Sequence, residues 1–110
     1  MKKLLLLIFL IPAITLMAQE KEVLTKLDAK ADFYGDLARQ IWSNPELGYL
    51  EKNSSQLLQK TLSDAGFKVT AGVAGIPTAF VAEFGSGKPV IGIMAEFDAL
   101  PGVSQEAVPF

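Results

Sequence analysis

The stretch Lys88-Pro89-Val90-Ile91-Gly92-Ile93-Met94-Ala95-Glu96-Phe97-Asp98-Ala99-Leu100-Pro101-Gly102 decides which fold this sequence can adopt. Its apolar run from Val90 to Ala95 does not alternate with polar residues. It therefore predicts a strand covered on both faces, as in the middle of an α/β sheet. Two carboxylates, Glu96 and Asp98, follow directly, and a Pro-Gly turn comes next. The sequence thus predicts two acids at the carboxyl end of a central strand, the edge where open α/β sheets bind ligands.

Two helices are expected before this run. Apolar residues recur every three or four positions over residues 20–43, which is typical of one long amphipathic helix. Asn44-Pro45 ends it, because a residue before proline is pushed out of the helical region. Asn53 or Ser54 can cap a second helix, and Gly66 follows it in the usual C-terminal position.

Shorter strands are expected between the second helix and the apolar run. They cover residues 67–70 and 78–84, with a glycine-punctuated loop between them. The tight turn at residues 85–88 predicts that the strand at 78–84 and the run at 90–95 form a hairpin. This order of elements is the opening of an α/β or mixed-sheet domain.

The first 18 residues predict a secretory signal peptide. Lys2 and Lys3 precede an apolar block from Leu4 to Ile11, and we expect cleavage after Ala18. The block is too short for a membrane span, which needs about 20 apolar residues. We therefore expect an exported protein, periplasmic or extracellular, with no stable membrane anchor after cleavage and a mature part at residues 19–110.

Composition excludes several classes of protein. The 110 residues contain no cysteine and no histidine, and the formal net charge is −2. There is accordingly no disulfide framework, no imidazole base and no zinc site built from nitrogen or sulfur ligands in these residues. Basic residues are dispersed, so no nucleic-acid partner is expected. The sequence stops in what looks like a loop at residues 105–110, and we expect an incomplete domain.

Glu96 and Asp98 are the pair of residues with chemical content. They could bind a divalent metal through oxygen ligands, orient a ligand, or take part in proton transfer. An aspartate before a turn also often does no more than accept backbone hydrogen bonds. Glu46 and Glu51 flank the turn between the helices, and we expect them to be solvated or to favour the positive end of the second helix. Residue type alone does not choose among these roles.

Four segments together resemble the start of an M20-family metallopeptidase, in its amidohydrolase branch. They are Asn44-Pro45-Glu46-Leu47-Gly48, residues 72–82, residues 87–91 and Glu96-Phe97-Asp98-Ala99-Leu100-Pro101-Gly102. The resemblance runs from about Leu24 onward. It implies the N-terminal part of a catalytic domain that is a three-layer α/β/α sandwich with a mixed sheet. A small lid or dimerisation domain interrupts that sandwich later in the family.

The resemblance also implies a function. It implies a hydrolase with two divalent metal ions, zinc or manganese, acting on small amide or dipeptide-like substrates such as N-acyl amino acids or aminobenzoyl-glutamate. A homodimer is an expected assembly of the complete protein. In the family motif His-x-Asp, the aspartate steers the metal geometry, and Asp98 matches it as the candidate catalytic residue.

Glu96 occupies the histidine position of that motif, and we do not assign it as a metal ligand. The resemblance implies that this branch recruits a ligand from a downstream His-x-Cys-Gly-His segment, which is absent from this sequence. The chain by itself is therefore expected to lack the metal ligands and to be inactive. The alternative is a secreted, non-catalytic α/β binding module on the same scaffold.

Overall fold

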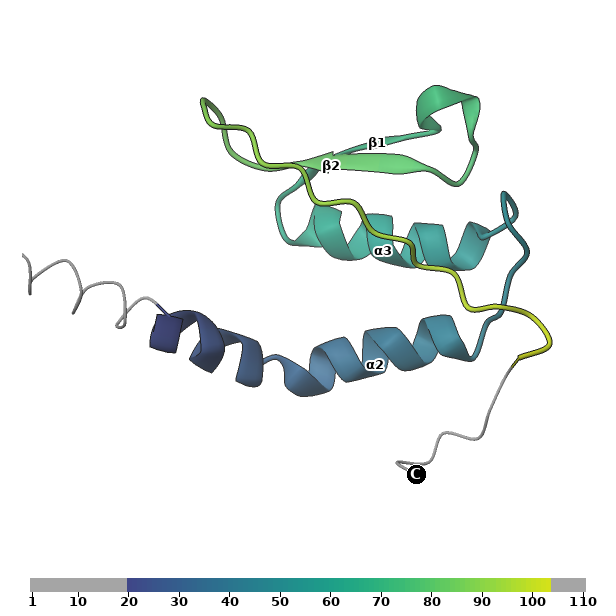
Figure 1. The fold of residues 1–110 in the computed structure, drawn as a ribbon, viewed down its shortest axis with the longest axis horizontal. Helices are drawn as coiled ribbons and strands as arrows, with labels where there is room; N and C mark the ends of the chain where they lie inside the picture. The colour runs from purple at the N-terminus through teal and green to yellow at the C-terminus, as the bar shows by residue number, and fades with distance from the viewer. Residues whose placement is uncertain (1–19, 104–110) are drawn as a thin grey trace, which may run out of the picture. The chain divides into compact units, whose positions relative to one another are not determined.

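A computed structural model describes residues 20–103 of the chain (Figure 1). The signal peptide expected at residues 1–18 lies outside the described residues. The chain divides into two compact units, Met1–Asp36 and Leu37–Phe110. Between residues 20 and 103, no helix is long and apolar enough to cross a membrane.

The described part of the first unit is helical. Residues 20–28 form a helix that ends in a turn at Ala29 and Lys30, and helix α2 (Ala31–Trp42) starts directly after it. The turn is closed by a bond of 3.0 Å from the Lys30 N–H to the Leu27 carbonyl, three residues back. The prediction of one unbroken helix over residues 20–43 is therefore wrong, since the turn at Ala29 and Lys30 divides it. The spacing of apolar residues did not reveal the turn, because an apolar stripe can continue across a local break in the backbone.

The second unit begins in the last turns of α2 and contains helix α3 (Lys52–Asp64). Helix α2 ends before Asn44-Pro45, as predicted. Helix α3 also ends where predicted: Gly66 has a φ of 90°, and the Phe67 N–H bonds the Leu62 carbonyl at 3.0 Å. This geometry is the left-handed C-terminal cap that glycine favours.

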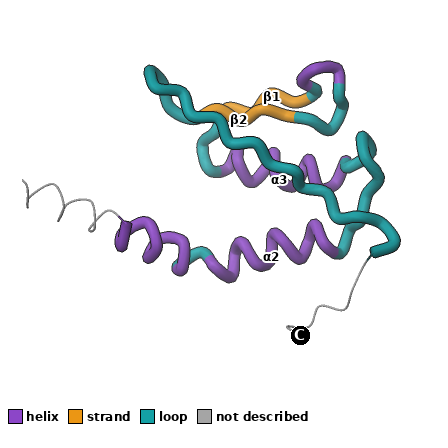
Figure 2. The backbone as a smooth tube through the Cα atoms, in the orientation of Figure 1, coloured by secondary structure: helices purple, strands orange, loops and turns teal. Residues whose placement is uncertain are grey.

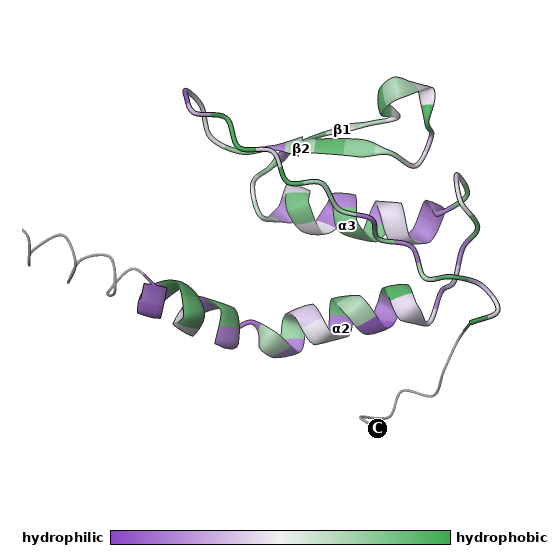
Figure 3. Cartoon of the chain, viewed as in Figure 1, coloured by the Kyte–Doolittle hydropathy of each residue, from purple (hydrophilic) through white to green (hydrophobic). Residues whose placement is uncertain are grey.

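Strands β1 (Lys68–Ala71) and β2 (Phe80–Glu83) form a two-stranded antiparallel sheet, so both shorter strands are confirmed. In the register, Lys68 pairs with Glu83 and Ala71 with Phe80. The short 3₁₀ helix η1 (Val73–Gly75) connects them. Figure 1 shows α3 along one face of this sheet, and Figure 3 colours β2 as mainly hydrophobic.

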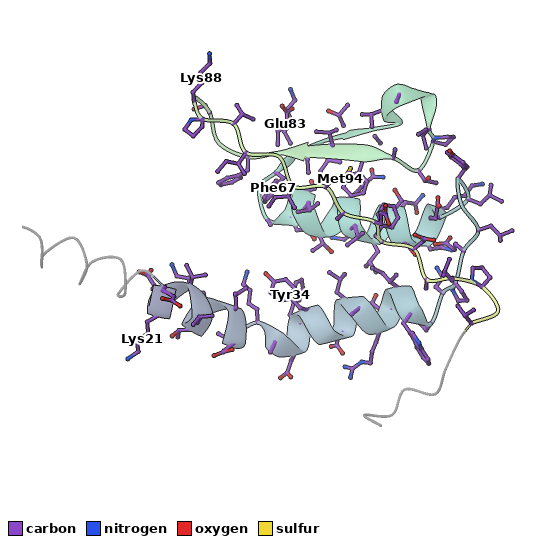
Figure 4. The ribbon with its side chains drawn as sticks, viewed as in Figure 1. Lys21, Tyr34, Phe67, Glu83, Lys88 and Met94 are labelled. Carbon is purple, nitrogen blue, oxygen red and sulfur yellow. The ribbon has the colours of Figure 1, made fainter. Side chains whose placement is uncertain are left out.

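Residues 90–95 do not form the expected central strand. Figure 2 draws the whole described segment after β2 as loop. Val90, Ile91, Ile93 and Met94 are 85%, 82%, 92% and 93% exposed, and Figure 4 labels Met94 on this segment. The predicted hairpin is also wrong, since β2 pairs with β1. The physical reason is that a central strand needs neighbours for its backbone groups and layers for its faces, and the described residues supply neither.

The fold is a mixed α/β arrangement, as predicted for the opening of an α/β domain. Within residues 20–103, no apolar side chain is fully buried. The buried side chains there are polar: Ser54, Ser55 and Thr78, at 2%, 2% and 6% exposure. Ser55 and Thr78 are hydrogen-bonded to each other beside the candidate site, whereas Ser54 is bonded to Glu46.

Candidate functional site

Asp98 and Glu96 lie in the wall of a hollow of about 250 Å³ in the second unit. Three segments enclose it: the turn at residues 48–51, the approach to β2 at residues 76–79, and residues 95–98. The Phe97 and Phe80 rings, with centroids 6.1 Å apart, place the third segment beside β2. The lining residues are Gly48, Tyr49, Glu51, Ile76, Thr78, Ala79, Ala95, Glu96, Phe97 and Asp98.

The two acids of the sequence motif are exposed on a loop, and neither follows a strand. The structure adds a third carboxylate, Glu51, which the sequence did not assign to this site. In the described part of the chain, no group of three or more acidic residues could hold a metal ion. The hollow therefore does not fit a metal centre with these residues alone.

A larger hollow of about 420 Å³ lies between residues 40–44 and α3. Its lining is made of amides, hydroxyls, Leu57 and Lys60, without an acid. Neither Glu96 nor Asp98 lines it. The smaller hollow is consequently the candidate site, because it combines the motif acids with an apolar wall.

Glu51 joins two of the segments around the candidate site. Its Oε2 accepts a hydrogen bond of 2.7 Å from the Thr78 hydroxyl, and its Oε1 accepts one of 2.9 Å from the Tyr49 N–H. The hydrogen bond from Thr78, together with backbone donors, holds the pKa of Glu51 below its usual value. Tyr49 has a φ of 65°, the left-handed region that few residues with large side chains adopt.

Glu46 caps α3 from the preceding loop. Its Oε1 accepts bonds of 2.9 and 3.0 Å from the backbone N–H and side-chain amide of Asn53. Its Oε2 accepts bonds of 2.9 and 2.8 Å from the backbone N–H and hydroxyl of Ser54. Partial burial raises the pKa of Glu46, but these four bonds outweigh that effect and lower it. A carboxylate at this place also faces the positive end of the helix dipole.

Glu46 was expected either to be solvated or to favour the positive end of the second helix, and this geometry confirms the second alternative. It also corrects the expected cap. Helix α3 begins at Lys52 after Glu51, so Asn53 and Ser54 lie inside it as donors. Sequence reasoning did not foresee this, because Asn and Ser are usual N-cap residues. The acceptor that replaces their cap is a glutamate several positions earlier.

Ser55 connects α3 to the candidate site. Its hydroxyl donates a bond of 2.6 Å to the Thr78 carbonyl and accepts one of 2.8 Å from the Gln59 side chain. Thr78 is thus held through its carbonyl by Ser55 and through its hydroxyl by Glu51. Sequence reasoning missed both Ser55 and Thr78. The available signal was the pair Ser54-Ser55 near the start of a helix, where hydroxyl side chains usually seek a backbone partner.

A first prediction concerns Glu46→Gln in the complete protein that contains this chain. A carboxylate whose folded pKa is lowered stabilises the fold above its unfolded value of 4.5, and that stability is lost as pH falls through the folded pKa. We expect the wild type to exceed the variant by about 1 kcal/mol at neutral pH. The difference should shrink progressively below about pH 4.5. Urea unfolding of both proteins from pH 3 to pH 7 measures it, and a difference independent of pH would contradict the assignment.

Comparison with known proteins finds curated relatives that are named as a hydrolase subunit, a carboxypeptidase and a dipeptidase. No family model matches the chain, and no solved structure matches it. The curated relatives are M20-family proteins, which confirms the resemblance stated from the motifs: this chain is related to M20-family hydrolases.

The first of these relatives is a subunit of the p-aminobenzoyl-glutamate hydrolase of Escherichia coli, 48% identical over 81 residues, which are 74% of this chain and 17% of that protein. Thermostable carboxypeptidase 2 of Saccharolobus solfataricus is 40% identical over 72 residues, covering 64% of this chain and 18% of the relative. Xaa-Arg dipeptidase of Homo sapiens is 33% identical over 91 residues, covering 70% and 21%. The chain thus spans about a fifth of the length of the curated relatives it matches.

Proposed function

We propose that the complete protein containing this chain hydrolyses amide bonds, with N-acyl amino acids or aminobenzoyl-glutamate-like compounds as substrates. The observation that carries the proposal is the 48% identity to an aminobenzoyl-glutamate hydrolase subunit. The names of the other relatives, a carboxypeptidase and a dipeptidase, agree on cleavage of amide or peptide bonds. In this proposal the hydrolase depends on divalent metal ions, whose ligands lie outside residues 20–103.

The candidate site supplies chemistry that suits such a substrate. Asp98 is an exposed carboxylate, which can accept hydrogen bonds from an amide N–H or hold a proton near the reacting group. Ile76, Ala79 and Phe97 give the hollow an apolar wall for the uncharged part of a small molecule. We assign Asp98 as the candidate catalytic residue on this basis and on the motif it shares with the family.

The proposal is tested with the complete protein expressed from the reading frame that encodes this chain. Release of the amino acid from N-acyl amino acids and from aminobenzoyl-glutamate is followed by chromatography, with and without a chelator. We expect hydrolysis that the chelator abolishes and that added zinc or manganese restores.

Hydrolysis that survives thorough chelation would remove the metal from the proposal. Substrate binding in calorimetry without any hydrolysis would instead favour a non-catalytic binding module on the same scaffold. An oligomeric state measured on the same sample tests the expected homodimer.

A further inference from the structure

Glu51 connects two of the segments that line the candidate site through hydrogen bonds. Its two carboxylate oxygens accept from different segments, Oε1 from Tyr49 and Oε2 from Thr78, 27 positions further along the chain. Its side chain also lines the hollow with Asp98. We infer that Glu51 is a positioning residue, which fixes the hollow in which Asp98 acts. The activity measurements that test this role rest on the proposed function.

The burial of Thr78 explains why the bond from Thr78 to Glu51 matters. Thr78 is 6% exposed, so a hydroxyl without a partner there would lose its hydrogen bonds to water without replacement. In the described part of the chain, every buried side-chain nitrogen or oxygen has a partner. Removing the Glu51 carboxylate would leave the Thr78 hydroxyl without its acceptor and would free the segment at residues 76–79 from the turn at residues 48–51.

The backbone of Tyr49 gives a second reason. A non-glycine residue in the left-handed region is held at a cost of about 1 kcal/mol or more, and it persists only where the surroundings fix it. Here the Tyr49 N–H is bonded to Glu51. Tyr49 is also 68% exposed at the rim of the hollow. Loss of the Glu51 side chain would therefore remove a hydrogen bond from the turn at residues 48–51 and one from the segment at residues 76–79.

The test uses the variants Glu51→Ala and Thr78→Val, alone and combined, in the complete protein. We expect each single variant to lower kcat/KM by about tenfold or more, mainly through kcat. The double variant should be no worse than Glu51→Ala, because both remove the same bond. Glu51→Gln should restore part of the activity, since its amide oxygen can still accept from Thr78.

Glu46→Ala is the matched control. It removes an acceptor of four hydrogen bonds at the start of α3, against two for Glu51, and Glu46 does not line the hollow. A merely structural role predicts that the variant with the larger loss of Tm loses more activity. The positioning role predicts the reverse, with kcat/KM of Glu46→Ala within about twofold of wild type at temperatures where it is folded.

Hydrogen exchange gives a readout that needs no substrate. In Glu51→Ala we expect faster exchange at residues 48–51 and 76–79, with the middle of α3 unchanged. In Glu46→Ala we expect faster exchange at the start of α3 alone. If the wild type hydrolyses none of these substrates, the proposed function is wrong. The positioning role of Glu51 is then tested by hydrogen exchange alone. Unchanged exchange at residues 48–51 and 76–79 in Glu51→Ala, or activity losses that follow Tm in both variants, would overturn the inference.

Discussion

Replacing Asp98 with alanine in the complete protein is expected to lower kcat/KM for amide hydrolysis by about 100-fold, with little change in stability. Asp98 is exposed on a loop, so the fold does not depend on its packing, and surface changes of this kind shift stability by about 0.5 kcal/mol or less. Steady-state kinetics and a thermal melt on the same preparation measure the two effects.

The matched control for Asp98→Ala is Asp64→Ala, which removes an exposed acid from the last turn of α3. Asp64 pairs with Lys60 on the surface, and such pairs contribute about 0.3–0.5 kcal/mol. Its activity should equal that of the wild type. Asp98→Asn separates charge from shape, and it should behave like the alanine variant if the carboxylate is what matters. Full activity in both Asp98 variants would remove Asp98 from the site.

The elements that the sequence predicted correctly are those whose ends depend on neighbouring residues. Asn44-Pro45 ends α2 because of a steric restriction between adjacent residues. Gly66 ends α3 because a residue without a Cβ tolerates positive φ. The strands β1 and β2 follow from composition and from the turn residues between them. In each case the decisive interaction spans only a few positions in the sequence.

The predicted strand at residues 90–95 failed for the opposite reason. Its apolar pattern predicts a strand that is covered on both faces, but the covering elements must come from other parts of the chain. In the described chain, β2 has β1 as its partner, and Val90 to Met94 remain exposed. A central strand forms only where distant residues supply partner strands and covering layers. The local sequence of residues 90–95 does not determine whether those residues are present.

The candidate site shows the same division. Glu96 and Asp98 could be predicted together because they are two positions apart in one motif. The joining of Glu51 to Thr78 could not, since 27 positions separate them and no local pattern relates a glutamate after a turn to a threonine before a strand. The helix start was one of the two places expected for Glu46, because a carboxylate near that end is favoured whatever its partners are.

Self-association of the isolated chain follows from the exposed run and is the second large effect that we expect. Residues 19–110 should form oligomers that grow with concentration and should melt over a broad range. Val90, Ile91, Ile93 and Met94 are each more than four-fifths exposed, and an unpaired apolar segment offers backbone groups for pairing with another copy. Sedimentation velocity and circular dichroism measure both properties.

The variant Ile91→Glu/Ile93→Glu tests whether this run causes the association. Residues two apart share a face of an extended chain, so both charges would oppose burial against another copy. Burial of an isoleucine side chain contributes about 1.5–3 kcal/mol, and losing even one such contribution weakens association by about tenfold or more. Ser63→Glu/Ser86→Glu adds the same charge at exposed polar positions and should associate nearly as the unmodified chain does. A sharp, cooperative melt of monomeric residues 19–110 would show that the described fold is stable without a cover over this run.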